Sequence, residues 1–171
     1  MNQKDGNVLI NISSGIGDAL MAEPMVRALK QAKPDTKVDL LVSLPTKAIF
    51  QNNSLVDRMF LLELRFLKFI KLIRQLRKQR YDLYIGTIPS NTLSQVLVPY
   101  LTNILFRIKH RTPHTGSRDF DFLFNIIEPI PEGRHRMWCN MDLLKQVGVS
   151  HNKAQEATQL FLSEEDLRNA D

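Results

Sequence analysis

A short polar turn near the start of the chain carries residue types that could do chemistry. It follows the apolar run 8–12 and reads Ser13-Ser14-Gly15-Ile16-Gly17-Asp18. Two glycines one residue apart allow a sharp turn and close approach of a ligand to the backbone, and the free amides that open a following helix favour anions. A carboxylate at Asp18 would repel a pyrophosphate there but could accept a proton from a hydroxyl group. The turn therefore predicts a general base at Asp18 or, as a structural alternative, a helix N-cap.

The same turn does not complete a cofactor-binding fingerprint. A dinucleotide site has a third glycine three residues after the second, where this chain has Leu20, and no P-loop motif occurs. The lone Cys139 predicts a small buried apolar side chain and not a metal ligand. His110 and His114 are four residues apart, but Pro113 opposes the helix that would place both on one face. We expect no cofactor and no metal site.

Alternating apolar and helical segments must position this turn. Strand-like runs cover 8–12, 37–43, 57–62, 82–86 and 104–108, and helical patterns cover 18–33, 46–53 and 65–80. Strands that alternate with helices favour parallel pairing, because parallel neighbours need crossover connections. The predicted fold class is α/β, a Rossmann-like parallel sheet with helices on both faces. Ligands bind beyond the carboxyl ends of such strands, so we expect the turn to lie at the site. A last helix should end at Gly148.

Composition and charge narrow the class of partner. The chain has 171 residues, 43% of them hydrophobic, and a net charge of +5, which fits one globular domain. The segment from Arg65 to Arg80 contains basic residues and no acid, and no Asp or Glu lies between Leu83 and Arg118. The positive electrostatic potential of these segments favours an anionic partner. Because the basic residues of the loop 109–118 are not interleaved with aromatic ones that could stack on bases, we expect no nucleic acid partner.

The helical pattern at 65–80 is amphipathic. Its apolar residues share one predicted face, namely Phe66, Phe69, Ile70, Ile73 and Leu76. Its basic residues lie largely opposite, namely Lys68, Lys71, Arg74 and Lys78. This pattern predicts a helix packed on the sheet, with a basic face that lies in solvent or against an anionic membrane.

The loop after the fifth strand carries a second group of basic residues. Lys109, Arg111 and Arg118 could bind the phosphate or carboxylate of an acidic acceptor, because the forked Arg side chain matches such groups with two hydrogen bonds. The alternative is an ordinary surface loop.

Longer stretches of the chain resemble a known family. The run 8–42, VLINISSGIGDALMAEPMVRALKQAKPDTKVDLLV, resembles the opening of glycosyltransferase family 9, which includes the ADP-heptose:lipopolysaccharide heptosyltransferases. The segments LVDRMFLL, RYDLYIG and GRHRMWCNMDLLKQVGV follow in the family's order, so the likeness spans about residues 7 to 150. It implies a GT-B architecture of two Rossmann-like domains, of which this chain resembles the N-terminal half.

This resemblance implies roles for the turn. Asp18 would be the general base that deprotonates the acceptor hydroxyl in an inverting transfer of a heptose-like sugar, and the backbone at Ser13, Ser14, Gly15 and Gly17 would line the cleft. The acceptor would be a glycan or a lipid-linked acidic molecule of lipopolysaccharide type. A nucleotide-sugar donor would bind only with a second domain, because the family's later motifs have no counterpart here. We therefore divide the chain into an acceptor-binding domain, 1–150, and a polar C-terminal segment, 151–171, that leads toward a missing donor domain.

Three functions fit these observations. The first is the acceptor-binding half of an inverting glycosyltransferase, inactive without its other half. The second is a non-catalytic truncated homologue or partner-binding module. The third is a nucleotide-binding regulatory Rossmann protein, since a glycine turn after the first strand is common to many such folds. The first residues resemble neither a signal peptide nor a transit sequence, so we expect a cytoplasmic protein with peripheral contact at the inner face of the membrane.

Overall fold

A six-stranded sheet organises the chain, whose computed structural model describes residues 6–90, 92–112, 120–150, 157–161 and 168. The strands are β1 (Asn7–Asn11), β2 (Lys37–Val42), β3 (Arg58–Leu61), β4 (Leu83–Gly86), β5 (Phe106–His110) and β6 (Ile126–Glu128). They lie in the order β3-β2-β1-β4-β5-β6, and every neighbouring pair is parallel. Strands β2 and β3 are thus added on one side of β1, and β4, β5 and β6 are added on the other side, so the order of addition reverses between β1 and β4.

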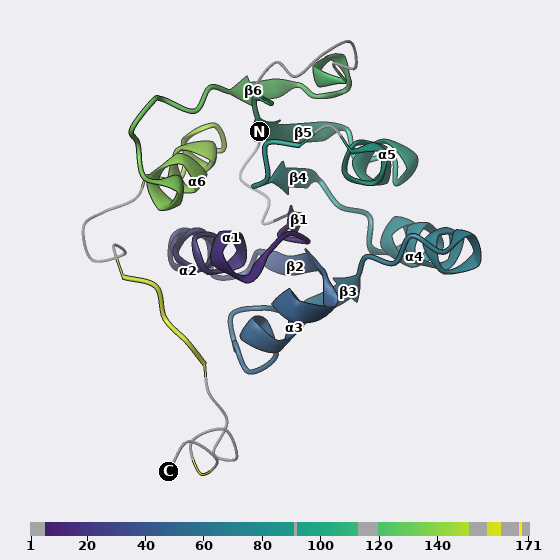
Figure 1. Ribbon diagram of the computed structural model, residues 1–171, viewed down its shortest axis with the longest axis horizontal. Helices are drawn as coiled ribbons and strands as arrows, with labels where there is room; N and C mark the ends of the chain where they lie inside the picture. Colours follow the sequence, from purple (N-terminus) through teal and green to yellow (C-terminus); the bar gives the residue numbers. More distant parts are fainter. Residues whose placement is uncertain (1–5, 91, 113–119, 151–156, 162–167, 169–171) are drawn as a thin grey trace.

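Helices cover both faces of the sheet (Figure 1). They are α1 (Ile16–Leu20), α2 (Glu23–Ala32), α3 (Leu44–Phe50), α4 (Phe66–Gln79), α5 (Leu93–Leu101) and α6 (Arg136–Lys145), with a short 3-10 turn at Asp121–Leu123. Helices α1, α2 and α6 lie on one face, and α4 and α5 lie on the other. This arrangement confirms the predicted fold class. Within the described residues, we find no helix with the length and apolar character that crossing a membrane requires.

Two hydrophobic cores follow from the strand pleat. Successive residues of a strand point to opposite faces, so Leu9 and Ile10 belong to different cores. Ile10 packs with Leu40 and the residues of α2 and α6, whereas Leu9 packs with Leu41 and the residues of α4. Both cores are needed because the central strands are buried on both sides.

The predicted helix 18–33 is two helices in the structure. Helix α1 ends at Leu20, and α2 begins at Glu23 with Pro24 as its second residue. Proline has no N–H to continue the hydrogen bonds of α1 and is tolerated in the first turn of a helix, so the chain ends one helix and starts another. As a result Asp18 lies on a helix of five residues.

Other element boundaries also differ from the sequence prediction. Strand β5 lies at Phe106–His110, and not at 104–108, so Lys109 and His110 belong to the sheet. Helix α5 and strand β6 were not predicted, because α5 contains Pro99 and β6 has three residues. Gly148 has a φ of +75° just after α6, which confirms the predicted stop. Cys139 is buried, as predicted.

The prediction that Phe66 lies on the packed face of α4 is wrong. Its side chain is 76% exposed. Packing of α4 on the sheet begins one turn later, with Phe69, Leu72, Ile73 and Leu76. These four residues follow the i, i+3, i+4, i+7 spacing of a buried helix face. The first turn of α4, which contains Phe66, precedes this face.

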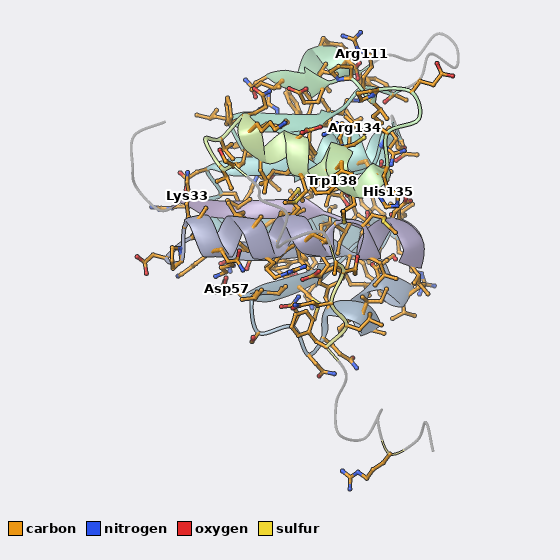
Figure 2. All side chains as sticks on the ribbon, turned by 90° about the vertical axis from the view of Figure 1, so that its left-hand side faces the viewer. Lys33, Asp57, Arg111, Arg134, His135 and Trp138 are labelled. Atoms are coloured by element: carbon orange, nitrogen blue, oxygen red, sulfur yellow. The ribbon has the colours of Figure 1, made fainter. Side chains whose placement is uncertain are left out.

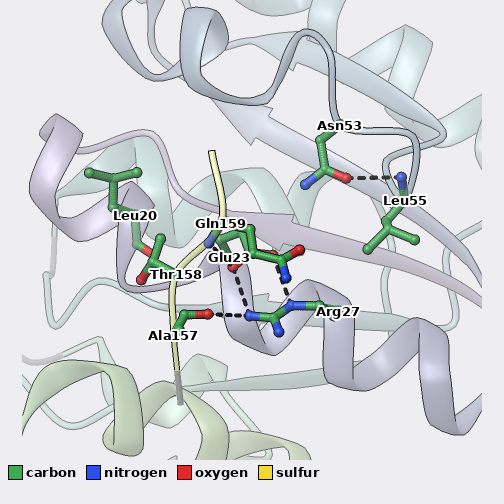
Figure 3. A network of polar contacts seen from close by, with 8 residues as sticks. All are labelled: Leu20, Glu23, Arg27, Asn53, Leu55, Ala157, Thr158 and Gln159. Atoms are coloured by element: carbon green, nitrogen blue, oxygen red, sulfur yellow. Dashed lines mark hydrogen bonds and ion pairs between the residues drawn. The ribbon is translucent and has the colours of Figure 1, made fainter. Parts of the chain in front are cut away.

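A buried ion pair on α2 holds the C-terminal segment (Figure 3). Arg27 Nε lies 3.2 Å from Glu23 Oε1, and their side chains are 9% and 1% exposed. The guanidinium of Arg27 also donates to the carbonyl of Ala157, and the backbone amide of Gln159 donates to Glu23 Oε2 at 3.0 Å. The segment 157–159 therefore crosses α2, although the predicted division at residue 150 stays a prediction.

Removing one partner of this ion pair should destabilise the protein strongly. Arg27→Ala leaves the Glu23 carboxylate buried without its counter-charge, and we expect a loss of about 3 kcal/mol in the free energy of unfolding, measured by urea denaturation. Lys68→Ala is the matched control, because its pair with Glu63 is exposed and should contribute less than about 1 kcal/mol. Equal effects of the two substitutions would contradict this role of the buried pair.

Candidate active site

The carboxyl ends of the strands form one edge of the molecule, which we call the carboxyl edge. In a parallel sheet whose order reverses between two strands, the crevice beyond those strands is the usual ligand site. Here the reversal lies between β1 and β4, and the turn that follows β1 contains Ser13 to Asp18. Figure 2 shows Arg111 and His135 toward this edge, with Lys33 and Asp57 toward the opposite one.

Asp18 lies in the first turn of α1 with its side chain exposed. The N-cap of this helix is Gly15, and Asp18 is the third helical residue, so the N-cap alternative is wrong. Its carboxylate makes no hydrogen bond or ion pair with the part of the chain that the structure describes. A carboxylate placed at the crevice and not used by the fold is available to a ligand, and it could accept a proton from a hydroxyl group.

Asn11, the last residue of β1, shapes the turn. Its Oδ1 accepts hydrogen bonds from the backbone N–H of Ser13 at 3.0 Å and from the Ser13 hydroxyl at 2.7 Å. Its Nδ2 donates to the Tyr84 hydroxyl at 2.8 Å. On the other side, the Ser43 hydroxyl donates to the carbonyl of Ser14 at 3.1 Å. The turn is therefore fixed by the N-cap residue of α3 and by β4 as well as by its own strand.

These supporting residues were missed in the sequence. Asn11 is 1% exposed within an otherwise apolar strand, and a buried polar residue there was the available signal. Tyr84 extends this hydrogen-bond network to α5, since its hydroxyl donates to the carbonyl of Gln95 at 3.2 Å. Burial raises the pKa of Tyr84 above its usual range, although the hydrogen bond from Asn11 lowers it in part. The hydroxyl therefore stays neutral and keeps its proton for this hydrogen bond.

Lys109 has an internal partner and does not lie in the loop. It is 2% exposed in β5, its Nζ lies 2.5 Å from Asp121 Oδ1, and it donates to the Thr112 hydroxyl at 3.1 Å. The ammonium also lies 5.0 Å from the centre of the Phe124 ring. Gly86 leaves room for it, because a Cβ at position 86 would lie 3.2 Å from Lys109 Cβ. Lys109 thus joins β5 to the segment that follows the loop.

The other two basic candidates differ in position. Arg111 is exposed directly after β5, and its backbone N–H donates to the carbonyl of Glu128 at 2.7 Å, which fixes the start of the loop. Arg118 lies outside the described residues. The structure therefore places Ser13, Ser14 and Gly15 in the turn after β1, Gly17 and Asp18 in the first turn of α1, and Arg111 at the same edge.

The buried His110 is linked through Asn140 to the end of α1, the helix that carries Asp18. Asn140 Nδ2 on α6 donates to the carbonyl of Met21 at the end of α1, at 3.0 Å. The amide oxygen of Asn140 then faces His110 Nε2 at 3.0 Å, so that nitrogen carries the proton. Burial lowers the pKa of His110 to about 4, and the hydrogen bond to Asn140 offsets part of the shift. The neutral imidazole thus connects β5, α6 and α1. Within the described residues no cluster of metal-ligating side chains is found.

The stability of the protein should fall on acidification because of His110. Its pKa is lower in the folded state than the ordinary value of 6.5, so between about pH 6.5 and 4 the unfolded chain binds a proton that the folded protein does not. We expect a loss of roughly 1–3 kcal/mol in the free energy of unfolding across this range, measured by urea denaturation. His110→Gln should flatten this dependence, whereas His135→Gln, at an exposed position, should leave it unchanged. An unchanged slope in His110→Gln would assign the acid sensitivity to other groups.

The fold and the reversal of strand order between β1 and β4 define a Rossmann-like α/β domain with a candidate site at the switch point of the sheet. No family model matches the chain, and no curated protein matches it. Solved structures do match, and this chain spans about half the length of the glycosyltransferases among them.

The matching structures include glycosyltransferases. A glycosyltransferase of family 9 from Veillonella parvula superimposes with a TM-score of 0.74 at 14% identity, over 96% of this chain and 47% of that one. Escherichia coli heptosyltransferase WaaC with ADP gives 0.67 at 21% identity, over 86% and 49%. The E. coli ADP-heptose lps heptosyltransferase II gives 0.64 at 20%, over 93% and 47%. These values confirm the resemblance to family 9 at the level of the fold.

Proposed function

We propose that this chain is the acceptor-binding half of an inverting glycosyltransferase that uses a nucleotide-activated, heptose-like sugar. One observation carries the proposal: the Asp18 carboxylate is exposed at the switch point of the sheet and has no partner within the described structure. The side chains of Asn11, Ser13 and Ser43 are used to shape the turn, whereas the Asp18 carboxylate is left for chemistry. The likeness in fold to heptosyltransferases supports the same class of reaction.

In the proposed reaction Asp18 acts as the general base. Its carboxylate accepts the proton of an acceptor hydroxyl as the hydroxyl oxygen attacks the anomeric carbon of the sugar. The bond from that carbon to the nucleotide diphosphate breaks on the opposite side, the diphosphate leaves with the bonding electrons, and the configuration is inverted. The Asn11 network holds the turn, which keeps the base in place. Arg111 is placed to bind an anionic group of the acceptor, and Arg118 is assigned the same role.

The donor requires a second domain in this proposal. Ile16 and Leu44, which open α1 and α3 at the carboxyl edge, are 52% and 72% exposed. Apolar side chains exposed beside a candidate base are suited to packing against another domain across the crevice. The solved structure of WaaC is with ADP, and this chain covers 49% of that protein. The acceptor is a glycan or lipid-linked acidic molecule of lipopolysaccharide type, and the protein works at the cytoplasmic face of a membrane, with peripheral contact through the helix 65–80.

Replacing the base should abolish most of the turnover. In a two-domain protein that contains this chain, Asp18→Asn removes the proton acceptor but keeps the size of the side chain, and we expect turnover to fall by at least about a hundredfold with little change in donor affinity. Asp35→Asn, at an exposed position in the turn before β2, is the control and should keep full activity. Near-normal turnover of Asp18→Asn would refute the assigned role.

The 171-residue chain by itself should not bind the donor nucleotide. We expect no heat of binding for ADP up to about millimolar concentration in isothermal titration calorimetry, because the diphosphate has no site at a turn that carries Asp18. Micromolar affinity of the isolated chain would instead support the nucleotide-binding regulatory protein and contradict the division of donor and acceptor between two domains.

A further inference from the structure

The start of α4 exposes three large apolar side chains that nothing in the described structure covers. Leu64, Phe66 and Leu67 are 70%, 76% and 78% exposed. We call these three residues the apolar tip. They follow β3 and open α4, so they lie at the carboxyl edge, and Figure 1 shows α4 on the outside of its helical layer. Adjacent exposed apolar residues of this size mark a contact surface more often than single ones do.

Basic residues surround the apolar tip and continue along α4. Those with exposed positions are Arg65, Lys68, Lys71, Arg74, Arg77 and Lys78. The sequence has no Asp or Glu from Leu64 to Tyr81. A shallow groove of about 370 Å³ runs along the outer side of the helix, with Leu67 and Ile70 among its apolar lining and Lys71, Arg74 and Lys78 among its basic lining.

The distribution of these groups favours an extended anionic plane as the occupant. The cations from Lys68 to Lys78 span about 15 Å along the helix axis, too far apart to converge on one phosphate group. The apolar tip lies at one end of this basic row, where it could pass between lipid headgroups while the cations stay at their level. Lys68 is paired with Glu63 beside the tip, and α4 itself contains no acid. Positive charge beside exposed apolar side chains is the pattern of helices that lie on anionic bilayers.

We propose that the protein docks on an anionic lipid bilayer by inserting the apolar tip and lying with the outer face of α4 against the headgroups. The sequence predicted the basic face but placed Phe66 in the core, so insertion of side chains follows from the structure. The proposal deepens the proposed function and rests on it for the acceptor: docking would bring the domain to a surface that holds a lipid-linked acceptor, with the tip and Asp18 at the same edge of the sheet but on its opposite faces.

Vesicle binding by the 171-residue chain tests this proposal. Phosphatidylcholine vesicles with about 30% phosphatidylglycerol should sediment the protein, and vesicles of pure phosphatidylcholine should not. Phe66→Ser with Leu67→Ser should weaken binding to the anionic vesicles at least about tenfold. Leu105→Ser is the matched control, because Leu105 is 81% exposed but precedes β5 at the opposite edge, and it should bind as the unmodified chain does. Charge reversal at Lys71 and Arg74 should abolish binding.

Insertion has a separate readout. Since Cys139 is buried, an environment-sensitive fluorophore can be attached selectively to a cysteine introduced by Leu67→Cys. Its emission should shift to the blue on adding anionic vesicles, and that of the same dye at Leu105→Cys should not.

Three results would overturn the proposal. One is the absence of binding to anionic vesicles. Another is binding that salt abolishes and that the double serine variant leaves unchanged, which would mean electrostatic contact without insertion. The third is a dimer of the unmodified chain in sedimentation that the double serine variant converts to monomer, which would mean that a second copy covers the tip. None of these results bears on Asp18, whose role is tested by turnover.

Discussion

Parallel hydrogen bonding of β1 between β2 and β4 is the constraint on which the rest of the structure depends. Ile10 pairs with Leu40 on one side and with Ile85 on the other, so β1 has no free edge and both of its faces are buried. Because all six strands run in the same direction, each segment that leaves a strand starts at the same edge of the sheet. Residues far apart in the sequence, such as Asp18, Phe66 and Arg111, are gathered there by topology and not by direct contact.

At that edge the polar groups divide into two kinds. Asn11, Tyr84 and Lys109 are buried, and their hydrogen bonds or ion pairs join neighbouring strands and loops. Buried polar groups with partners add rigidity and a specific geometry, and they are costly to disturb. Asp18 and Arg111 stand on this framework with exposed side chains. A rigid support beneath a few uncommitted charged groups is the arrangement that positioning a substrate requires.

The fold was predictable from local patterns, and the support of the site was not. Apolar strands separated by helical patterns indicated the parallel sheet, and Gly148 indicated the end of α6, because both signals depend on neighbouring residues in the chain. The distant partners, Asp121 for Lys109 and Tyr84 for Asn11, come from another segment and another strand, and sequence spacing carries no information about them. Phe66 was misplaced for a related reason: periodicity shows which side of a helix is apolar, but not how far the neighbouring sheet extends beneath it.

The contact between Gly86 and Lys109 limits how this edge of the sheet can change over evolution. These residues face each other in the register of β4 and β5, and a Cβ at position 86 would lie 3.2 Å from the Cβ of Lys109. A methyl group there would also lie 3.3 Å from the Tyr84 ring. Every residue except glycine has a Cβ, so shortening the lysine does not open this space, and it would leave Asp121 without its buried cation. A residue larger than glycine at position 86 would require β4 and β5 to shift, so this position is expected to stay glycine while the residues around it diverge.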